Sequence, residues 1–339
     1  MENRYSRQIA FPPIGPEGQE KLGNSRVAII GLGALGSSSA NMLARAGIGF
    51  LRLIDRDYVE KSNLQRQVLY TEADAAEDTP KAIAAAEKLA SFNSEITIEP
   101  VIADVNSGNI DSLIGDVDLI VDATDNMEIR RLLNEACHHL KKPWIYGGVA
   151  GSYGMTMNFT GGDDDPCLSC LFEDDSLGLA AGETCATAGI LNMLTNTMAS
   201  IQCVEAVKIL IGADTVRREL LYIDMWFNEV DTVEVSKSPD CPVCVRGEYS
   251  VYGKPPVTQA VSLCGRNSVQ IAPAGQVSID FEEYAEKLGK LGSVTIGKFT
   301  LDFDDGKIGI KLFKDGRAVI KNVNDEKKAR AIYSEYIGL

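Results

Sequence analysis

Four cysteines lie in two C-x-x-C pairs, Cys167 with Cys170 and Cys241 with Cys244, and each pair has a proline beside its first cysteine. Four thiolates in two such pairs are the ligand set of a closed tetrahedral zinc site. About 70 residues separate the pairs, more than in a zinc finger, so a metal would join distant segments of one domain and contribute to its folding. The pattern predicts structural zinc. The alternative is four free or redox-active thiols.

A glycine-rich loop is the second candidate site. Gly31, Gly33 and Gly36 stand between a short apolar run and a helical stretch, and Asp55 follows nineteen residues after the last glycine. Such glycines permit a tight turn and close approach of a phosphate to a helix N-terminus, and the carboxylate can accept hydrogen bonds from ribose hydroxyls. This predicts a nucleotide site; the alternative is a tight turn with a helix cap. The loop alone does not decide between NAD and ATP.

Two cations beyond Asp55 favour a triphosphate. Arg66 lies in the polar segment 63–67, where a dehydrogenase has no obvious need for an arginine. Lys81 follows Pro80 in the first turn of an expected helix, where a cation opposes the helix dipole at a cost of about 0.3 to 1 kcal/mol. A nearby anion would explain its position. The alternative for both is a solvated surface charge. No Walker A motif occurs, which excludes a P-loop ATPase.

Acidic residues also follow a later strand. Asp122 and Asp125 flank the carboxyl end of the apolar run 119–121, and carboxylate oxygens there could hold Mg²⁺ against phosphates. We assign this role to Asp125. The alternative is that Asp125 or Asn126 caps the next helix, a function that both side chains perform well.

The other cysteines and the histidines are less informative. Cys185 precedes a long apolar helix, and proximity to a helix N-terminus favours a nucleophilic thiolate; its position alone leaves function and a passive role equally open. Cys137, Cys203 and Cys264 lie in apolar or strand-like sequence and are expected in the core. His138 and His139 are the two histidines, too few for zinc sites built on several imidazoles.

The elements that must position these residues alternate between strand and helix. Expected strands span 27–30, 50–54, 96–105 and 119–121, and expected helices span 37–46, 80–89 and 127–140. This alternation predicts an α/β fold with a Rossmann-like, doubly wound and mostly parallel sheet. Ligands then belong at the carboxyl ends of the strands.

After residue 150 the pattern changes. Strand-like sequence (148–162) leads to a polar, aperiodic stretch (173–189) expected to be a crossover loop, a long apolar helix (190–211) and late antiparallel strands (220–235). We place a domain boundary near 248, dividing the chain into 1–248 and 249–339. The second domain is expected to be a small α+β module with strands at 257–271, 293–303, 307–313 and 317–321 and helices at 281–291 and 325–336.

Composition limits the function classes. The 339 residues carry 33 lysines and arginines against 48 aspartates and glutamates, a net charge of −15, which disfavours nucleic acid and anionic membranes as partners. With 45% hydrophobic and 24% charged residues, the chain has the composition of a globular protein. It shows no signal-peptide core and no apolar run of about 18 to 20 residues, so a cytoplasmic protein is expected.

Together these motifs resemble the ThiF/MoeB/HesA family, bacterial relatives of the ubiquitin-activating enzymes. The matching segments occur in the family's order over roughly residues 1–246: 4–8, 31–36, 55–57, 62–67, 80–81, 122–126, 184–185 and both cysteine pairs. The resemblance implies an adenylyltransferase that uses Mg-ATP to activate the C-terminal glycine carboxylate of a small ubiquitin-like sulfur carrier, of the ThiS or MoaD type. Pyrophosphate is released, and a sulfur donor then forms a thiocarboxylate for thiamin or molybdopterin cofactor synthesis.

The resemblance also assigns roles to residues. It implies nucleotide binding by Gly31, Gly33, Gly36, Asp55, Asp57, Asn63, Arg66, Gln67, Lys81 and Asp125. Asn63, Arg66 and Lys81 would bind phosphate and stabilise charge at the α-phosphorus, and Asp125 would position Mg²⁺. Arg7 would reach the triphosphate of a neighbouring subunit, which implies a homodimer with composite sites. Cys185 matches a crossover-loop cysteine that some members join covalently to the carrier and others lack.

Two other functions remain as alternatives. A nicotinamide-dependent oxidoreductase could use the same glycine loop, but it leaves Arg66, Lys81 and Asp125 unexplained. A non-catalytic, zinc-clipped scaffold would leave the phosphate-handling residues without purpose. The sequence does not separate ThiS-type from MoaD-type carriers. The extension after 248 could dock a carrier or a sulfur donor, or form a structural lid.

Overall fold

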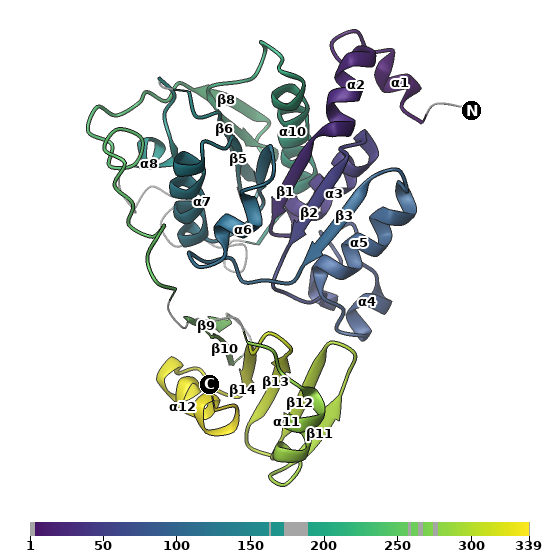
Figure 1. Cartoon of the computed structure of the whole chain (residues 1–339), viewed down its shortest axis with the longest axis vertical. Helices are drawn as coiled ribbons and strands as arrows, with labels where there is room; N and C mark the ends of the chain where they lie inside the picture. Colours follow the sequence, from purple (N-terminus) through teal and green to yellow (C-terminus); the bar gives the residue numbers. More distant parts are fainter. Residues whose placement is uncertain are drawn as a thin grey trace. The chain divides into compact units, whose positions relative to one another are not determined.

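The chain forms two compact units in the computed structural model (Figure 1). The model describes residues 4–162, 164–172, 189–256, 259–263, 267–273 and 277–338. The first unit comprises Met1–Ala75 and Pro80–Lys254, and the second comprises Ala76–Thr79 and Pro255–Leu339.

The first unit is built on an eight-stranded sheet with the strand order β3-β2-β1-β4-β5-β6-β7-β8. The first five strands are parallel, and the last three continue the sheet in antiparallel pairs. The strands are β1 (Arg26–Ile30), β2 (Phe50–Ile54), β3 (Thr97–Val101), β4 (Leu119–Asp122), β5 (Trp144–Ala150), β6 (Tyr153–Phe159), β7 (Leu220–Asp224) and β8 (Glu229–Val233). The predicted mixed sheet with late antiparallel strands is confirmed.

Helices cover both faces of this sheet, so its central strands are apolar throughout. Along β1, Val27 and Ile29 pack in one core with α3, α5 and α10, while Ala28 and Ile30 pack in the other with α6 and α7. The helices are α1 (Ser6–Ile9), α2 (Gly15–Asn24), α3 (Ala34–Ala46), α4 (Glu72–Ala76), α5 (Lys81–Phe92), α6 (Ile110–Ile114), α7 (Met127–Leu140), α8 (Leu168–Leu171) and α10 (Asn192–Ile211), with a 3₁₀ turn η1 (Lys61–Asn63).

The strand predicted over 96–105 is shorter in the structure. β3 stops at Val101 because its neighbour β2 ends at the paired residue Ile54. Beyond that point the chain has no strand to pair with, and it turns along the carboxyl edge of the sheet. The prediction was therefore wrong for 102–105.

Residues 250–252, at the end of the first unit, are held by a buried carboxylate on α7. Glu135 accepts hydrogen bonds from the backbone amides of Ser250, Val251 and Tyr252 at 2.8–2.9 Å. These residues consequently belong to the first unit, which continues to Lys254.

The second unit contains a six-stranded antiparallel sheet with the order β11-β12-β13-β14-β10-β9. Its strands are β9 (Gln259–Leu263), β10 (Ser268–Ala272), β11 (Ser293–Ile296), β12 (Thr300–Asp304), β13 (Gly309–Phe313) and β14 (Ala318–Lys321), and its helices are α11 (Phe281–Leu288) and α12 (Glu326–Tyr336). A separate apolar core joins sheet and helices.

Two strands expected to be continuous in this unit are hairpins. The stretch 257–271 contains β9 and β10, which pair with each other. The stretch 293–303 contains β11 and the start of β12, joined by a turn in which the amide of Gly297 donates to the carbonyl of Thr300 at 2.8 Å. Both segments are apolar enough on each side of the turn to read as single strands.

None of the helices in the described part of the chain combines the length and apolar character needed to cross a bilayer.

Candidate active site

The glycine loop joins β1 to α3 at the carboxyl edge of the sheet, and its three glycines have different reasons for being glycine. Gly31 has a φ of +87°, and a Cβ there would lie 2.8 Å from the carbonyl oxygen of Ala123. A Cβ on Gly36 would lie 1.8 Å from the carbonyl oxygen of Gly31. Around Gly33, the nearest atom to such a Cβ is Nε2 of Gln67 at 3.9 Å. The outer glycines serve backbone packing, and Gly33 leaves room for a ligand.

This difference predicts different outcomes for two similar substitutions. Gly36→Ala is expected to lower the melting temperature because the new methyl group collides with the backbone of Gly31. Gly33→Ala is expected to keep the melting temperature and to weaken ATP binding about tenfold or more, because the methyl group occupies space that the ligand needs. Thermal unfolding and calorimetric titration with a non-hydrolysable ATP analogue measure both effects. Unchanged affinity in Gly33→Ala would show that nothing binds against this position.

Asp55, the residue after β2, holds the glycine loop in place through hydrogen bonds. Its buried carboxylate accepts hydrogen bonds at 2.6 Å from the amides of Leu32 and Asp57. Burial raises the pKa of Asp55, and the charge of Asp57 raises it further, whereas Lys81 and the two amides lower it. The residue predicted to hold the ribose therefore also fixes the loop. Any ribose hydroxyl would share an oxygen already in use.

Tyr70 braces the same loop from another side. Its buried hydroxyl donates to the carbonyl of Leu32 at 2.8 Å, and burial raises the pKa of Tyr70 well above its ordinary value. Sequence reasoning missed this residue because it ends an ordinary apolar run. Its spacing from the loop carries no signal.

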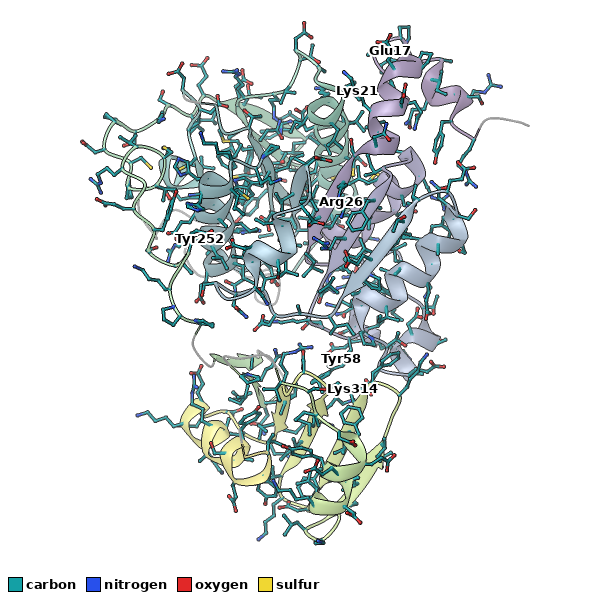
Figure 2. All side chains as sticks on the ribbon, in the orientation of Figure 1. Glu17, Lys21, Arg26, Tyr58, Tyr252 and Lys314 are labelled. Atoms are coloured by element: carbon teal, nitrogen blue, oxygen red, sulfur yellow. The ribbon has the colours of Figure 1, made fainter. Side chains whose placement is uncertain are left out.

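Lys81 is the first residue of α5, and its side chain is buried. Its Nζ lies 3.1 Å from Oδ2 of Asp57, and its amide donates to the carbonyl of Asp57 at 2.9 Å. A bridge between Tyr58 and Pro80 joins the same two segments; Tyr58 is labelled in Figure 2. The anion expected near this lysine is thus supplied at least in part by the chain itself.

The charge state of Lys81 follows from its neighbours. Burial alone would lower the pKa of Lys81, but nearby carboxylates outweigh burial and raise that pKa to about 12. These carboxylates belong to Asp57, Asp55 and Asp125. The structure therefore brings one permanent cation together with three predicted acidic residues at the edge of the glycine loop.

The segment 61–67 contains two buried polar side chains and a half-buried arginine. Asn63 and Gln67 are buried, and Oε1 of Gln67 has no hydrogen-bond partner among the described residues. Gln67 also lies against Gly33. Arg66 is half-buried, and its guanidinium donates to the carbonyl of Ser62 at 3.0 Å.

The two aspartates after β4 have different surroundings. Asp122 is fully buried; its Oδ1 accepts from the amide and hydroxyl of Thr124, and its Oδ2 accepts from Arg130. Asn126 caps α7 by accepting from the amides of its first turn. Asp125 is exposed between them. The cap is therefore made by Asn126, and the Asp125 carboxylate is the one presented to solvent at this edge.

Arg7 is not brought to the loop of its own chain. The adjacent Gln8 donates to the carbonyl of Ala46 at 2.9 Å, and Ala46 is the last residue of α3. Gly31 and Gly33 precede the first residue of this helix, and Gly36 lies in its first turn. The 13 residues of α3 span about 20 Å at 1.5 Å per residue, so Arg7 lies at the wrong end of the helix to contact a nucleotide held by its own chain.

The four predicted metal ligands are brought together. The Sγ atoms of Cys167 and Cys241 are 3.6 Å apart, those of Cys170 and Cys244 are 3.5 Å apart, and all four lie within 4.8 Å of one another. A tetrahedral ion with sulfur at about 2.3 Å needs sulfur atoms roughly 3.8 Å apart. The donor set therefore fits a metal such as zinc.

Polar groups around this cluster point at the sulfur atoms. Nδ2 of Asn134 lies 3.6 Å from Sγ of Cys167, and the amide of Ser238 lies 3.4 Å from Sγ of Cys170. Asn134 also accepts from the amide of Leu168 at 2.9 Å. Such donors stabilise thiolates and fix their orientation.

The remaining cysteines divide into two groups. Cys137 and Cys203 are buried in the two cores of the first unit, as predicted, and burial raises the pKa of each thiol. Cys185 and Cys264 lie outside the described residues.

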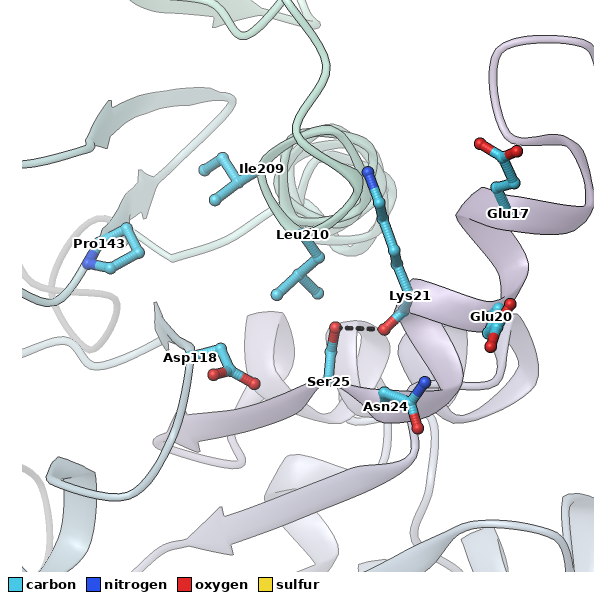
Figure 3. Close-up of a pocket in the computed structure, with 9 residues that line it drawn as sticks. All are labelled: Glu17, Glu20, Lys21, Asn24, Ser25, Asp118, Pro143, Ile209 and Leu210. Atoms are coloured by element: carbon cyan, nitrogen blue, oxygen red, sulfur yellow. Dashed lines mark hydrogen bonds between the residues drawn. The ribbon is translucent and has the colours of Figure 1, made fainter.

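A cavity lies at the opposite edge of the sheet from the glycine loop (Figure 3). Its volume is about 680 Å³ and its wall includes Lys21, Ser25, Asp118 and Pro143; the last three stand just before β1, β4 and β5. Lys21 is engaged there in capping α10, because its Nζ donates to the carbonyl of Ile211 at 2.6 Å. None of the predicted site residues lines this cavity, so it is separate from the glycine-loop site.

The chain belongs to the ThiF family, whose model matches residues 5–243. The sulfur carrier protein ThiS adenylyltransferase of Bacillus subtilis is 42% identical over 341 residues and covers 100% of both chains. The molybdopterin-synthase adenylyltransferase of Escherichia coli is 36% identical over 245 residues, 71% of this chain and 95% of that protein. The family predicted from the motifs is confirmed. These relatives give the oxidoreductase alternative no support.

Solved structures support the fold. A crystal structure of E. coli MccB with ATP has a TM-score of 0.62 at 23% identity, covering 72% of this chain and 75% of that chain. A crystal structure of PaaA has a TM-score of 0.56 at 25% identity, covering 68% and 82%. The MccB likeness, at this identity, shows the fold alone.

Proposed function

We propose that this protein uses Mg-ATP to adenylylate the C-terminal glycine carboxylate of a small ubiquitin-like sulfur carrier. The observation that carries the proposal is the buried Lys81 with its carboxylates at the rim of a glycine loop whose middle position, Gly33, stands open. A nucleotide phosphate fits between a helix N-terminus and such a cation. The names of the bacterial relatives agree with this reaction.

The chemistry assigns a task to each group. A carboxylate is a poor electrophile and must be activated before a sulfur donor can attack it. In the activation step the carrier's carboxylate oxygen attacks the α-phosphorus, and the bond from that phosphorus to pyrophosphate breaks. Lys81 and Arg66 would stabilise the charge on the phosphate oxygens. Asp125 would hold Mg²⁺, which neutralises phosphate charge when bound. Asn63 would bind phosphate beside these cations, and the glycine loop would lie against the nucleotide. Asp55 would hold the ribose, Gln67 would contact the nucleotide, and Asp57 would orient Lys81.

The carrier is proposed to be of the ThiS type, in thiamin synthesis. The proposal is supported by the B. subtilis relative named for ThiS, which matches this chain along its whole length at 42% identity. The test is ATP–pyrophosphate exchange with purified ThiS-type and MoaD-type carriers in parallel. We expect exchange with the ThiS-type carrier. Exchange only with the MoaD-type carrier would reverse the assignment, and exchange with neither would reject the proposed reaction.

The four-cysteine cluster is proposed to hold one structural zinc ion. Each of the four thiolates would occupy one position of a closed site, which leaves no open position for catalysis. Because Cys167 and Cys170 are joined in this way to Cys241 and Cys244, the metal would tie the segment after β6 to the end of the first unit. Elemental analysis of the purified protein is expected to give about one zinc per chain.

We further propose that the active enzyme is a homodimer with composite sites, because Arg7 lies at the far end of α3 from its own glycine loop.

We also propose that the chain consists of an adenylyltransferase domain and a C-terminal domain, with the boundary just after Lys254 in place of 248. A sulfur donor would act after adenylylation.

Composite sites predict that two inactive variants restore each other. Arg7→Ala and Lys81→Met are each expected to be inactive, because each substitution is present in both subunits and removes a residue from both sites of the dimer. After subunit exchange, a mixed dimer holds one intact site, so an equal mixture is expected to recover about a quarter of wild-type exchange activity. A mixture that stays inactive, although mass spectrometry shows mixed dimers, would contradict a contribution of Arg7 from the partner subunit.

A further inference from the structure

We propose that Arg130 is a positioning residue that holds the turn carrying Asp125. This inference rests on the proposed function, in which Asp125 holds Mg²⁺. Arg130 lies on the first turn of α7, and its side chain is 2% exposed. It is therefore out of reach of a substrate, and any effect on the reaction must pass through the groups it binds.

The guanidinium of Arg130 joins three segments at the carboxyl edge of the sheet. Its Nε donates to Oδ2 of Asp122 at 3.0 Å, at the end of β4. Its Nη2 donates to the carbonyl of Thr124 in the following turn and, at 2.8 Å, to the carbonyl of Gly147 in β5. Arg130 also lies over the ring of Tyr146, 5.0 Å from its centroid. One side chain thus fixes the turn against both neighbouring strands.

Asp122 completes the hold on this turn. While its Oδ2 faces Arg130, its Oδ1 accepts from the amide and hydroxyl of Thr124 at 2.9 and 2.7 Å. Asn126 fixes the other end by capping α7. Asp125 is thereby held from both sides, with its own carboxylate exposed.

A second helix contributes to the same network. Gln202, a fully buried residue of α10, donates to the backbone carbonyl of Asp122 at 3.0 Å. A Cβ on Gly147 would lie 2.4 Å from Nε2 of Gln202, so glycine is needed for the helix to approach. α7, α10 and β5 therefore all converge on the residues flanking Asp125.

The buried ion pair of Arg130 and Asp122 is not explained by stability alone. Burying an arginine and an aspartate costs desolvation that apolar residues would avoid, so such pairs contribute little net stability. Their advantage is geometric, because a guanidinium directs several donors at fixed angles, which the ammonium group of lysine does not reproduce. Arg130 and Asp125 also interact electrostatically. Both points favour a role in orienting the metal-binding turn.

The test compares metal binding with stability in the full-length protein. Arg130→Lys keeps the positive charge but loses the fixed arrangement of guanidinium donors. It is expected to weaken Mn²⁺ binding about tenfold, as for other groups that orient a metal ligand. Mn²⁺ serves as the probe, titrated by electron paramagnetic resonance in the presence of a non-hydrolysable ATP analogue. Hydrogen exchange at the amide of Thr124 is expected to become faster.

The matched control is Arg52→Lys. Arg52 is another buried arginine of the same sheet, paired with Asp116 and Glu99; its change is expected to lower the melting temperature and to leave Mn²⁺ affinity unchanged. If Arg130→Lys does not fold, Asp122→Asn removes the charge that Arg130 binds and is expected to act in the same direction. Unchanged Mn²⁺ affinity in a folded Arg130→Lys or Asp122→Asn protein would overturn the inference. Wild-type protein that binds Mn²⁺ with the analogue but shows no carrier-dependent exchange would reject the proposed function and leave this test intact.

Discussion

Replacing Lys81 by methionine is expected to lower carrier-dependent ATP–pyrophosphate exchange by about 10² to 10³, the effect of removing one preorganised group that stabilises developing charge. The lysine is buried, and the carboxylates of Asp57 and Asp55 keep it charged and oriented. Methionine has a similar shape but no charge, so it removes the cation and leaves those carboxylates facing the phosphate. Initial rates at saturating ATP and carrier measure the effect.

The control for this prediction is Lys88→Met on the same helix. Lys88 pairs with Asp74 and lies about two turns beyond Lys81 along α5, so its loss is expected to leave exchange near the wild-type rate. An Lys81→Met enzyme that also retains wild-type exchange would remove Lys81 from the proposed mechanism.

The pH dependence gives an independent check on Lys81. Its folded pKa of about 12 lies above the ordinary value of 10.5. The stabilisation from the charged lysine is therefore fully present below about pH 10.5 and is lost as the pH rises through about 12. Exchange measured between pH 7 and 9 is expected to show no change that Lys81 causes.

Replacing Cys241 by serine is expected to have the largest effect on stability. Zinc held by four thiolates contributes about 10 to 16 kcal/mol of binding free energy in small zinc-dependent domains. Losing one buried thiolate should release the metal and separate segments that are distant in the chain. We expect zinc content near zero and a fall in the melting temperature of at least about 20 °C, given 2 to 4 °C per kcal/mol for a domain of this size.

Cys203→Ala provides the matched comparison for the metal site. Cys203 is buried in an apolar core next to α3, with its thiol facing the carbonyl of Ser39. Its truncation costs some packing and is expected to leave about one zinc per chain. A Cys241→Ser protein with full zinc content and an unchanged melting temperature would contradict the metal assignment.

Much of the fold could be predicted because its signals are local. Apolar runs at 27–30, 50–54 and 119–121 correspond to β1, β2 and β4, since strands buried on both faces are apolar throughout. The end of β3 could not be located, because strand ends depend on where the neighbouring strand stops. The turn at Gly297 was missed although the apolar alternation changes phase there, from Val294 and Ile296 to Phe299, Leu301 and Phe303.

The candidate site was predictable wherever residue type and spacing carry the chemistry. The glycine loop, Lys81 and the cysteine pairs belong to this group. Asp57 joins Lys81 to the segment after β2, and the two cysteine pairs form a separate cluster. Tyr70 and Arg130 were missed because their roles depend on contacts between segments far apart in the sequence. The distinct surroundings of Asp122 and Asp125 were hidden for the same reason: burial separates them, whereas the sequence shows two aspartates in one short segment.

The most direct test of the proposed reaction follows the α-phosphate of ATP. The enzyme is mixed with ATP labelled at the α-phosphate, Mg²⁺ and a ThiS-type carrier, and the carrier is recovered and analysed for label and mass. We expect label on the carrier, a mass increase of one adenylyl group at its C-terminal glycine, and no label on a carrier lacking that glycine. A carrier that stays unlabelled, with all label remaining in free nucleotides, would contradict it.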